Sequence, residues 1–126
     1  MKKRVFPNYT LLQEVNGCNQ IVDKTLKIEY LPYIREVELD GHIFVTFHPV
    51  PAPKKWQVAE ITTGAIASNP GSVEHFYKTE ATAIKAAKKN IEESPLPLSV
   101  LIRNVKIGLL KHERLSVSMM QALDLL

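Results

Sequence analysis

The chain has 126 residues, of which 45% are hydrophobic and 23% are charged. This is the length of one ordinary domain, and the composition is that of a globular chain rather than a disordered one. Sixteen Lys and Arg against thirteen Asp and Glu give a net charge of +3 with acidic residues interspersed, whereas dedicated nucleic-acid binders concentrate their basic charge on one surface. No apolar run reaches the length of a membrane span, the basic start lacks the apolar core of a secretory signal, and Cys18 is the only cysteine. We therefore expect one soluble, cytoplasmic domain over residues 1–126.

Residues 1–53 are expected to be mainly β. The segment Thr25–Leu31 (TLKIEYL) is rich in strand formers and predicts a strand. Asp40-Gly41 is a hairpin signal. A two-residue loop would mix apolar and polar residues on each strand face, whereas a three-residue loop over 39–41 pairs Val37 with Ile43. We therefore expect the three-residue loop, with Gly41 in the left-handed position.

Residues 54–94 are expected to form a β-β-β-α unit after a proline-rich connector. The first strand begins at Trp56 and ends at the Thr63-Gly64 turn, AIAS returns as a second strand, and His75–Lys78 makes a third. Thr79 is a suitable N-cap for a helix that Pro95 ends. The apolar stripe of this helix, expected to cover the sheet and to bury Trp56, consists of Ile84, Ala87 and Ile91.

Residues 95–126 are expected to form two C-terminal helices, which completes an α+β fold around a small antiparallel sheet. The first helix has its main stripe at Leu98, Leu101, Ile102, Val105 and Leu109, with Val100 and Ile107 on another side. A helix that is apolar on two sides is sandwiched within its own chain or meets a second chain. The second helix, in LSVSMMQALDLL, repeats the pattern. We expect contact with another protein, or self-association, through Ile107, Leu110, Met120 and Leu125.

No catalytic or nucleotide-binding motif occurs in the sequence. The four histidines, His42, His48, His75 and His112, show no ligand spacing: the first two flank one expected strand and lie roughly 20 Å apart along it. The carboxylate pairs Glu36/Glu38 and Glu92/Glu93 are interpreted as solvated charge, and Cys18 as an incidental cysteine in an Asn-Gly turn. We therefore expect no enzyme activity, no metal and no cofactor.

The block "WQVAEITTGAIA…FYKTEATAIKAAKKNI" resembles the three-strands-plus-helix pattern of AP2-type and phage-integrase N-terminal DNA-binding domains, which also have a strand tryptophan, a turn glycine and an Ala-rich helix. The resemblance implies a sheet that contacts DNA. The sheets of those domains carry arginines that read bases, and Trp56–Lys78 contains none. The basic residues beside this block are Lys54, Lys55, Lys85 and Lys89, which would hold phosphates without reading sequence.

These features favour a small non-enzymatic protein-binding module that acts through sheet edges and helix surfaces. Short single-domain chains of this kind are typical of bacterial or phage accessory proteins that inhibit or regulate a host enzyme. The alternative is a nucleic-acid-binding protein that uses the Trp56–Lys78 sheet and the nearby lysines. A third reading is a small enzyme whose site carries no motif.

Overall fold

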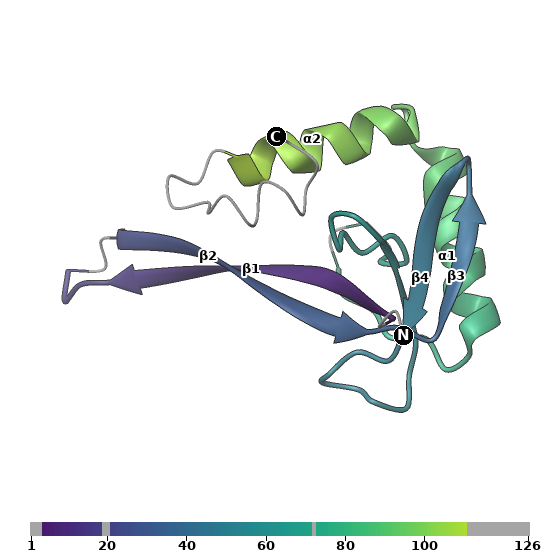
Figure 1. Cartoon of the computed structure of the whole chain (residues 1–126), viewed down its shortest axis with the longest axis horizontal. Helices are drawn as coiled ribbons and strands as arrows, with labels where there is room; N and C mark the ends of the chain where they lie inside the picture. Colours follow the sequence, from purple (N-terminus) through teal and green to yellow (C-terminus); the bar gives the residue numbers. More distant parts are fainter. Residues whose placement is uncertain (1–3, 19–20, 72, 111–126) are drawn as a thin grey trace.

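The computed structural model describes residues 4–18, 21–71 and 73–110. The elements in chain order are β1 (Val5–Val15), β2 (Ile21–Pro32), β3 (Arg35–Leu39), β4 (His42–Phe47), β5 (Gln57–Glu60), α1 (Glu80–Glu93) and α2 (Leu98–Leu110). The expected α+β fold, with strands first and helices in the C-terminal half, is confirmed (Figure 1). The second C-terminal helix expected from the sequence lies outside the described residues.

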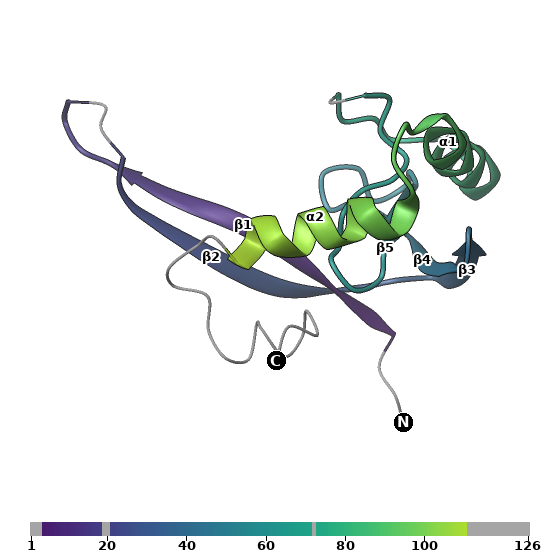
Figure 2. The ribbon, with the colours of Figure 1, turned by 90° about the horizontal axis from the view of Figure 1, so that it is seen from above.

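The strands form two antiparallel sheets. β1 and β2 pair along almost their whole length, from Val5–Pro32 to Val15–Ile21, and include the expected strand Thr25–Leu31. β3, β4 and β5 form a three-stranded meander. The β1–β2 hairpin extends away from this meander as an arm in both views (Figures 1 and 2). We call the meander together with α1 the body, and the β1–β2 hairpin the arm.

The hairpin between β3 and β4 differs from the expectation. Leu39 pairs with His42 and Val37 with Phe44, so the loop has two residues and the predicted three-residue loop is wrong. Asp40 and Gly41 have φ values of 50° and 78°, as a type I′ turn requires. The prediction assumed that only one face of the sheet is buried. Residues 44–47 of β4 are in fact all buried, so apolar side chains are needed on both faces.

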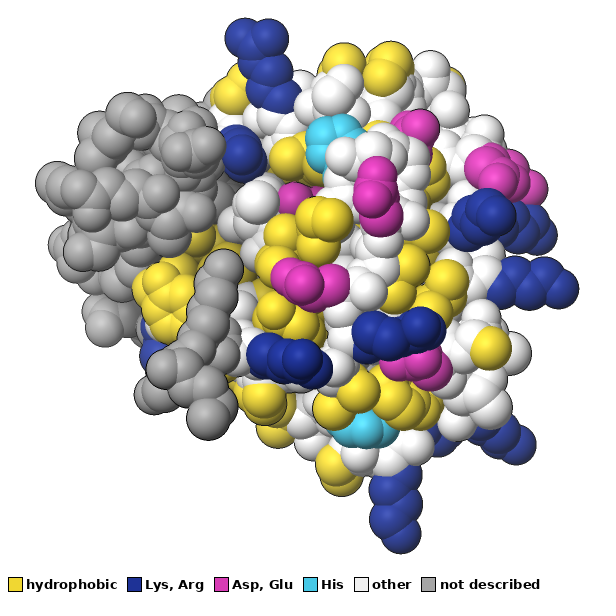
Figure 3. Space-filling model, turned by 45° about the vertical axis from the view of Figure 1, so that its right-hand side comes forward, with side chains coloured by type: hydrophobic (Ala, Val, Ile, Leu, Met, Phe, Trp, Pro, Cys, Tyr) yellow, Lys and Arg dark blue, Asp and Glu magenta, His cyan; other side chains and the backbone are white. Residues whose placement is uncertain are grey.

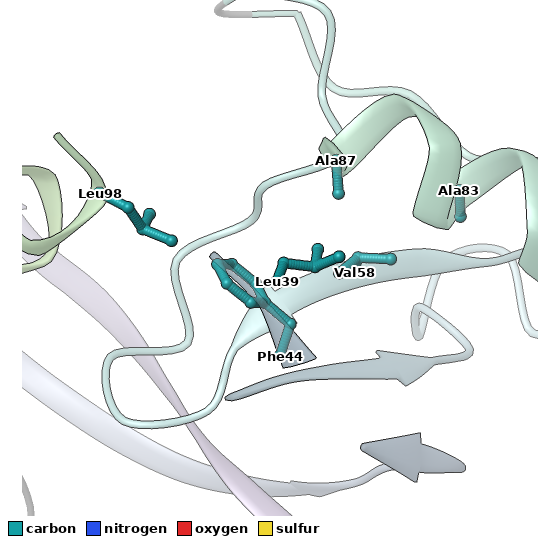
Figure 4. Packing of buried hydrophobic residues seen from close by; sticks show 6 residues of the cluster. All are labelled: Leu39, Phe44, Val58, Ala83, Ala87 and Leu98. Atoms are coloured by element: carbon teal, nitrogen blue, oxygen red, sulfur yellow. The ribbon is translucent and has the colours of Figure 1, made fainter. Parts of the chain in front are cut away.

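The core lies on the two faces of the three-stranded sheet. On one face, Leu39, Phe44 and Val58 pack against Ala83 and Ala87 of α1, and Leu98 of α2 completes the cluster (Figure 4). On the other face, Phe6 from the base of the arm packs with Val45, Phe47 and Ala59. Phe44 and Val45 belong to clusters on opposite faces of the sheet because successive side chains alternate between the two faces of a strand. Both faces of β4 are therefore covered, one by helix and one by the base of the arm.

The sequence features that predicted α1 are present. The Thr79 side chain accepts a hydrogen bond from the Thr82 N–H as N-cap, and Ser94, just before Pro95, is the C-cap. Ala83 and Ala87 are fully buried, and Ile84 and Ile91 pack at the edge of the cluster. The small alanine side chains allow the helix axis to lie close to the sheet.

The N-terminus of α1 is tied to the sheet by charged and polar contacts. The Glu80 carboxylate accepts hydrogen bonds from the Arg35 guanidinium and from the Thr46 hydroxyl, both at 2.8 Å. A carboxylate in the first turn also interacts favourably with the positive end of the helix dipole. These contacts fix where α1 crosses β3 and β4.

The expected β-β-β-α unit over residues 54–94 is only partly correct. β5 is its one regular strand; the other two expected strands are reduced to the isolated bridges Ala59–Ile66 and Trp56–Tyr77. One cause is visible next to the first bridge, where the Val58 N–H donates to the Ser68 hydroxyl at 3.0 Å instead of to a backbone carbonyl. The sheet that α1 covers is therefore completed by β3 and β4, which precede this block in the chain.

Trp56 is less buried than predicted. It is partly buried at the edge of the cluster that contains Ala83 and Ala87, and its ring lies 4.2 Å from the His48 ring, measured between centroids.

Among the helices of the described part of the chain, none combines the length and the apolar composition of a membrane span.

Candidate functional site

The first feature of interest is α2, which is apolar on two sides as the sequence predicted. Leu98 is buried against the body, while Leu101 and Ile102 are half-buried. On another side of the helix, the Val100 and Ile107 side chains are 37% and 41% exposed. Leu98, Leu101 and Ile102 thus anchor the first turns of α2, whereas Val100 and Ile107, and also Val105 further along the main stripe, are exposed. Of the remaining predicted contact residues, Met120 and Leu125 lie outside the described chain, as does the side chain of Leu110.

Beneath α2 is a cavity of about 370 Å³. Its wall is formed by α1, by α2, by the loop between β5 and α1, and by one residue each of β4 and β5. Its apolar lining includes Phe44, Ile66, Ile91, Leu98, Leu101 and Ile102, and its polar lining is Glu60, Thr63, Asn69 and Asn90. This combination of a mostly apolar wall with a few polar groups is typical of small-molecule sites.

The loop wall of the cavity is fixed by side-chain hydrogen bonds. The Asn90 amide of α1 donates to the carbonyl oxygens of Ala67 and Asn69, both at 2.8 Å. The side-chain Oδ1 of Asn69 accepts from the His75 N–H at 3.1 Å, and the Ser68 hydroxyl accepts from the Val58 N–H at 3.0 Å. These bonds pair polar groups of the loop with α1 and β5, which helps to hold this wall of the cavity in place.

Glu60 is the polar residue of the cavity that the sequence reading missed. Its side chain is only 4% exposed at the end of β5. Its carboxylate accepts from the Thr63 N–H and from the Thr63 hydroxyl, both at 2.7 Å, and from the Thr62 hydroxyl. The signal in the sequence was a glutamate in a strand-forming run, followed directly by Thr-Thr-Gly, which supplies donors for a buried carboxylate.

The Thr63-Gly64 turn joins the body to the arm. Gly64 has a φ of 70°, and a Cβ atom built on it would lie 2.0 Å from the Pro7 carbonyl oxygen of β1. Only glycine fits both this backbone conformation and this close approach. The turn predicted from the sequence is therefore also the point at which β1 contacts the end of β5.

The arm has two open strand edges. Within the described residues, β1 and β2 pair only with each other, so their outer N–H and C=O groups face no further strand. Residues 5–32 contain Lys24 and Lys27 against Glu14, Asp23 and Glu29, a net charge of −1 (two minus three). Open edges of low net charge suit the addition of another strand, whereas a phosphate backbone requires a basic surface.

Tyr9 of the arm has a buried hydroxyl without a hydrogen-bond partner. Burial, and to a smaller extent the neighbouring Tyr30, raises the pKa of Tyr9 to about 12. Tyr33, at the junction of arm and body, donates to the Glu36 carboxylate at 3.2 Å. Its pKa is also raised, by burial and by that hydrogen bond.

The lysines of the nucleic-acid alternative are all exposed, but they lie on two different elements. Lys54 and Lys55 precede β5, whereas Lys85 and Lys89 lie on α1. On the face that Figure 3 shows, Lys and Arg side chains are separated by acidic, apolar and uncharged ones and form no continuous basic patch. The sheet expected to contact DNA, Trp56–Lys78, is reduced to β5 and two bridges.

The remaining sequence candidates stay apart. In the residues that the structure describes, no group of three or more His, Cys, Asp or Glu side chains has the geometry of a metal site. Cys18 is exposed in a turn in which its N–H donates to the Asn16 side chain at 2.9 Å. The carboxylate pairs Glu36/Glu38 and Glu92/Glu93 are exposed, as expected.

Comparison with known proteins gives no assignment: no family model, no curated protein and no solved structure matches the chain.

Proposed function

We propose that the chain is a small, non-enzymatic protein-binding module of the cytoplasm that acts on another protein by direct contact. The observation that carries the proposal is α2. Its inner side holds it on the body through Leu98, and its outer side presents Val100 and Ile107 to solvent. These two residues are seven positions apart, which places them two turns apart on one side of the helix.

Such spacing is that of anchor residues in helix-in-groove recognition, where an apolar helix side enters a groove on the partner. The side chains between the anchors on this side, Arg103 and Asn104, are exposed and polar, so the contact combines two apolar anchors with a polar centre. β-branched side chains such as Val and Ile lose little rotamer freedom on binding. The free energy gained by burying their apolar surface is therefore reduced only slightly by lost side-chain entropy.

The arm supports the same proposal independently. Strands with open edges pair with an added strand from a partner, and natural proteins usually protect such edges when they have no partner. We propose that the partner is a regulated enzyme or a second copy of the chain, in keeping with an accessory protein that inhibits or regulates a host enzyme.

The proposal is tested by light scattering on the purified protein and on the complex that it forms with a partner co-purified from the source cell. We expect a self-associated species or a stoichiometric complex. Ile107→Asp should weaken that complex by a factor of ten or more, because a charge replaces an anchor. Ala81→Asp is the matched control: it places the same charge on an exposed position of α1 and should leave the complex intact.

A monomeric wild type that holds no partner contradicts the proposal. So does a complex that both aspartate variants form equally well, because the surface of α2 would then take no part in binding. Circular dichroism of both variants establishes that each retains the wild-type fold.

A further inference from the structure

The Glu60 carboxylate is a buried charge for which the described chain supplies no cation. Its side chain is 4% exposed. The ion pairs within residues 4–18, 21–71 and 73–110 are Lys27–Glu29 and Arg35–Glu80, and Glu60 is in neither. Buried carboxylates are rarely left without a positive partner, since hydrogen bonds from neutral donors only partly replace lost hydration.

The hydrogen bonds of Glu60 are unevenly divided between its two oxygens. Oε2 accepts from the Thr63 N–H and the Thr63 hydroxyl, both at 2.7 Å. Oε1 has the Thr62 hydroxyl at 2.6 Å, and the same hydroxyl lies 2.8 Å from Oε2. A hydroxyl has one proton, so Oε1 keeps unused acceptor capacity. The carboxylate therefore has room for one more strong donor.

The cavity that Glu60 lines is itself without positive charge. No Lys, Arg or His is among its described lining residues, and its remaining polar groups belong to Thr63, Asn69 and Asn90. The Asn90 amide hydrogens are already used by the carbonyl oxygens of Ala67 and Asn69. The wall that remains is largely aliphatic and aromatic. It would accept an apolar group while the carboxylate accepts a cationic one.

We propose that this cavity binds a small organic cation: an apolar amine whose ammonium group pairs with the Glu60 carboxylate and whose hydrocarbon part lies among Phe44, Ile66 and Ile91. A volume of about 370 Å³ is within the range of small-ligand sites. The anchors of the proposed protein contact, Val100 and Ile107, are not among the residues that line this cavity.

A neighbouring groove supplies the competing explanation. It shares Glu60 and Ile102 with the cavity and is also lined by His42, Arg103 and Lys106. If one of these side chains turned inward it would neutralise Glu60 from the other side, and the cavity would then prefer a neutral ligand. The two cases differ in whether an amine is preferred over an uncharged molecule of the same shape.

The test is a titration of the full chain, followed by amide NMR, with 2-phenylethylamine and separately with 2-phenylethanol. The two molecules have the same shape, but only the amine is positively charged at neutral pH. We expect saturable shifts from the amine in the amides of Ile66, Ile91 and Ile102. The alcohol should bind at least about tenfold more weakly, as loss of a hydrogen-bonded charge pair implies.

Two variants complete the test. Glu60→Gln should abolish the preference for the amine, whereas Glu92→Gln, which removes a carboxylate from the exposed side of α1, should keep it. Because Glu60→Gln disturbs the Thr62–Gly64 turn, a second variant, Val105→Trp, places a bulky ring at the cavity from α2 while all carboxylates stay, and should abolish binding of both probes. Equal binding of amine and alcohol to the wild type, an amine preference that survives in Glu60→Gln, or no binding by either probe overturns the proposal.

Discussion

The body and the arm are both antiparallel β structure, but they are stabilised in different ways. The body's central strand, β4, is buried on both faces, by α1 on one and by Phe6 of the arm on the other. The arm's strands have hydrogen-bond partners only in each other over the described residues. A two-stranded hairpin alone is marginally stable in water. The arm therefore depends on its anchorage to the body at its base.

This difference indicates which contacts hold the molecule together as one unit. The anchorage consists of Phe6, which enters the second core cluster, and of the close approach between Pro7 and Gly64. The Tyr33 N–H, directly after the end of β2, also donates to the Arg4 carbonyl at 3.1 Å. Apolar burial, backbone packing and a hydrogen bond therefore all converge on the first residues of β1.

The largest expected effect comes from removing the apolar part of this anchorage. Phe6 is 1% exposed and its ring lies 4.8 Å from that of Phe47. Phe6→Ala should lower the free energy of unfolding by about 3 to 5 kcal/mol, as for other buried Phe-to-Ala changes. Urea denaturation followed by Trp56 fluorescence measures this effect in the body.

Tyr30→Ala is the control, because Tyr30 is a large arm residue that is 57% exposed. It should cost about 0.5 kcal/mol or less. If Phe6→Ala leaves the stability of the body unchanged, the body folds without the base of the arm, and the second core cluster adds nothing to it.

The next largest effect is expected at the backbone contact. Gly64→Ala should cost about 3 kcal/mol or more, because the new Cβ meets the Pro7 carbonyl oxygen and the residue must adopt a positive φ. Gly71 has a similar φ, 61°, but a Cβ atom on it would meet open space. Gly71→Ala should therefore lower the free energy of unfolding by only about 1 to 2 kcal/mol. Equal losses in the two variants, measured by chemical denaturation, would mean that the approach to Pro7 is not a constraint.

A smaller effect is expected within the body at the start of α1. Thr79→Ala removes the side-chain acceptor for the Thr82 N–H and should cost about 1 kcal/mol. Thr79→Ser keeps the hydroxyl, so its free energy of unfolding should differ from that of the wild type by only about a few tenths of a kcal/mol. Thermal unfolding by circular dichroism compares the two, and an alanine variant as stable as the serine variant would show that the cap contributes nothing.

The smallest effect is expected in the arm at Tyr9. Its hydroxyl is buried and unpaired, so Tyr9→Phe should leave stability unchanged or raise it by up to about 1 kcal/mol. The pKa of Tyr9 in the folded protein, about 12, lies above the ordinary tyrosine value of 10.0. The unfolded chain therefore loses this proton first as pH rises, and the wild type should lose stability from pH 10 to pH 12.

Tyr9→Phe should lose less stability than the wild type over the same alkaline range. Denaturation midpoints at pH 8 and pH 11 measure the difference. Parallel pH dependence in the two proteins would show that Tyr9 ionises equally in the folded and unfolded states.

The sequence predicted what depends on local signals. α1 was predicted from its alanine-rich stripe, from Thr79 and from Pro95, and the Asp40-Gly41 turn was placed correctly in the chain. The apolar sides of α2 were also recognised from their spacing. These features are decided by a few neighbouring residues, so a single sequence suffices to find them.

The errors arose where distant segments determine the structure. The loop length at Asp40-Gly41 was wrong because the arm covers the second face of β4, and nothing near the turn shows that. The main partner of β5 was missed because its ladder is formed by β4, which precedes it in the chain, whereas the segment after Gly64 contributes only an isolated bridge. Glu60 was missed as a cavity residue because the cavity that it lines is also formed by α2, which follows it by about forty positions in the chain.

The contact between Gly64 and Pro7 also limits how this protein can change over evolutionary time. A side chain that clashes with another side chain can be accommodated when the neighbour becomes smaller. Here the neighbouring atom is a backbone carbonyl oxygen, which every amino acid carries, so no substitution at position 7 makes room at position 64. Descendants of this chain that keep the arm anchored in this way must keep glycine there, and those that lose it must reposition the arm.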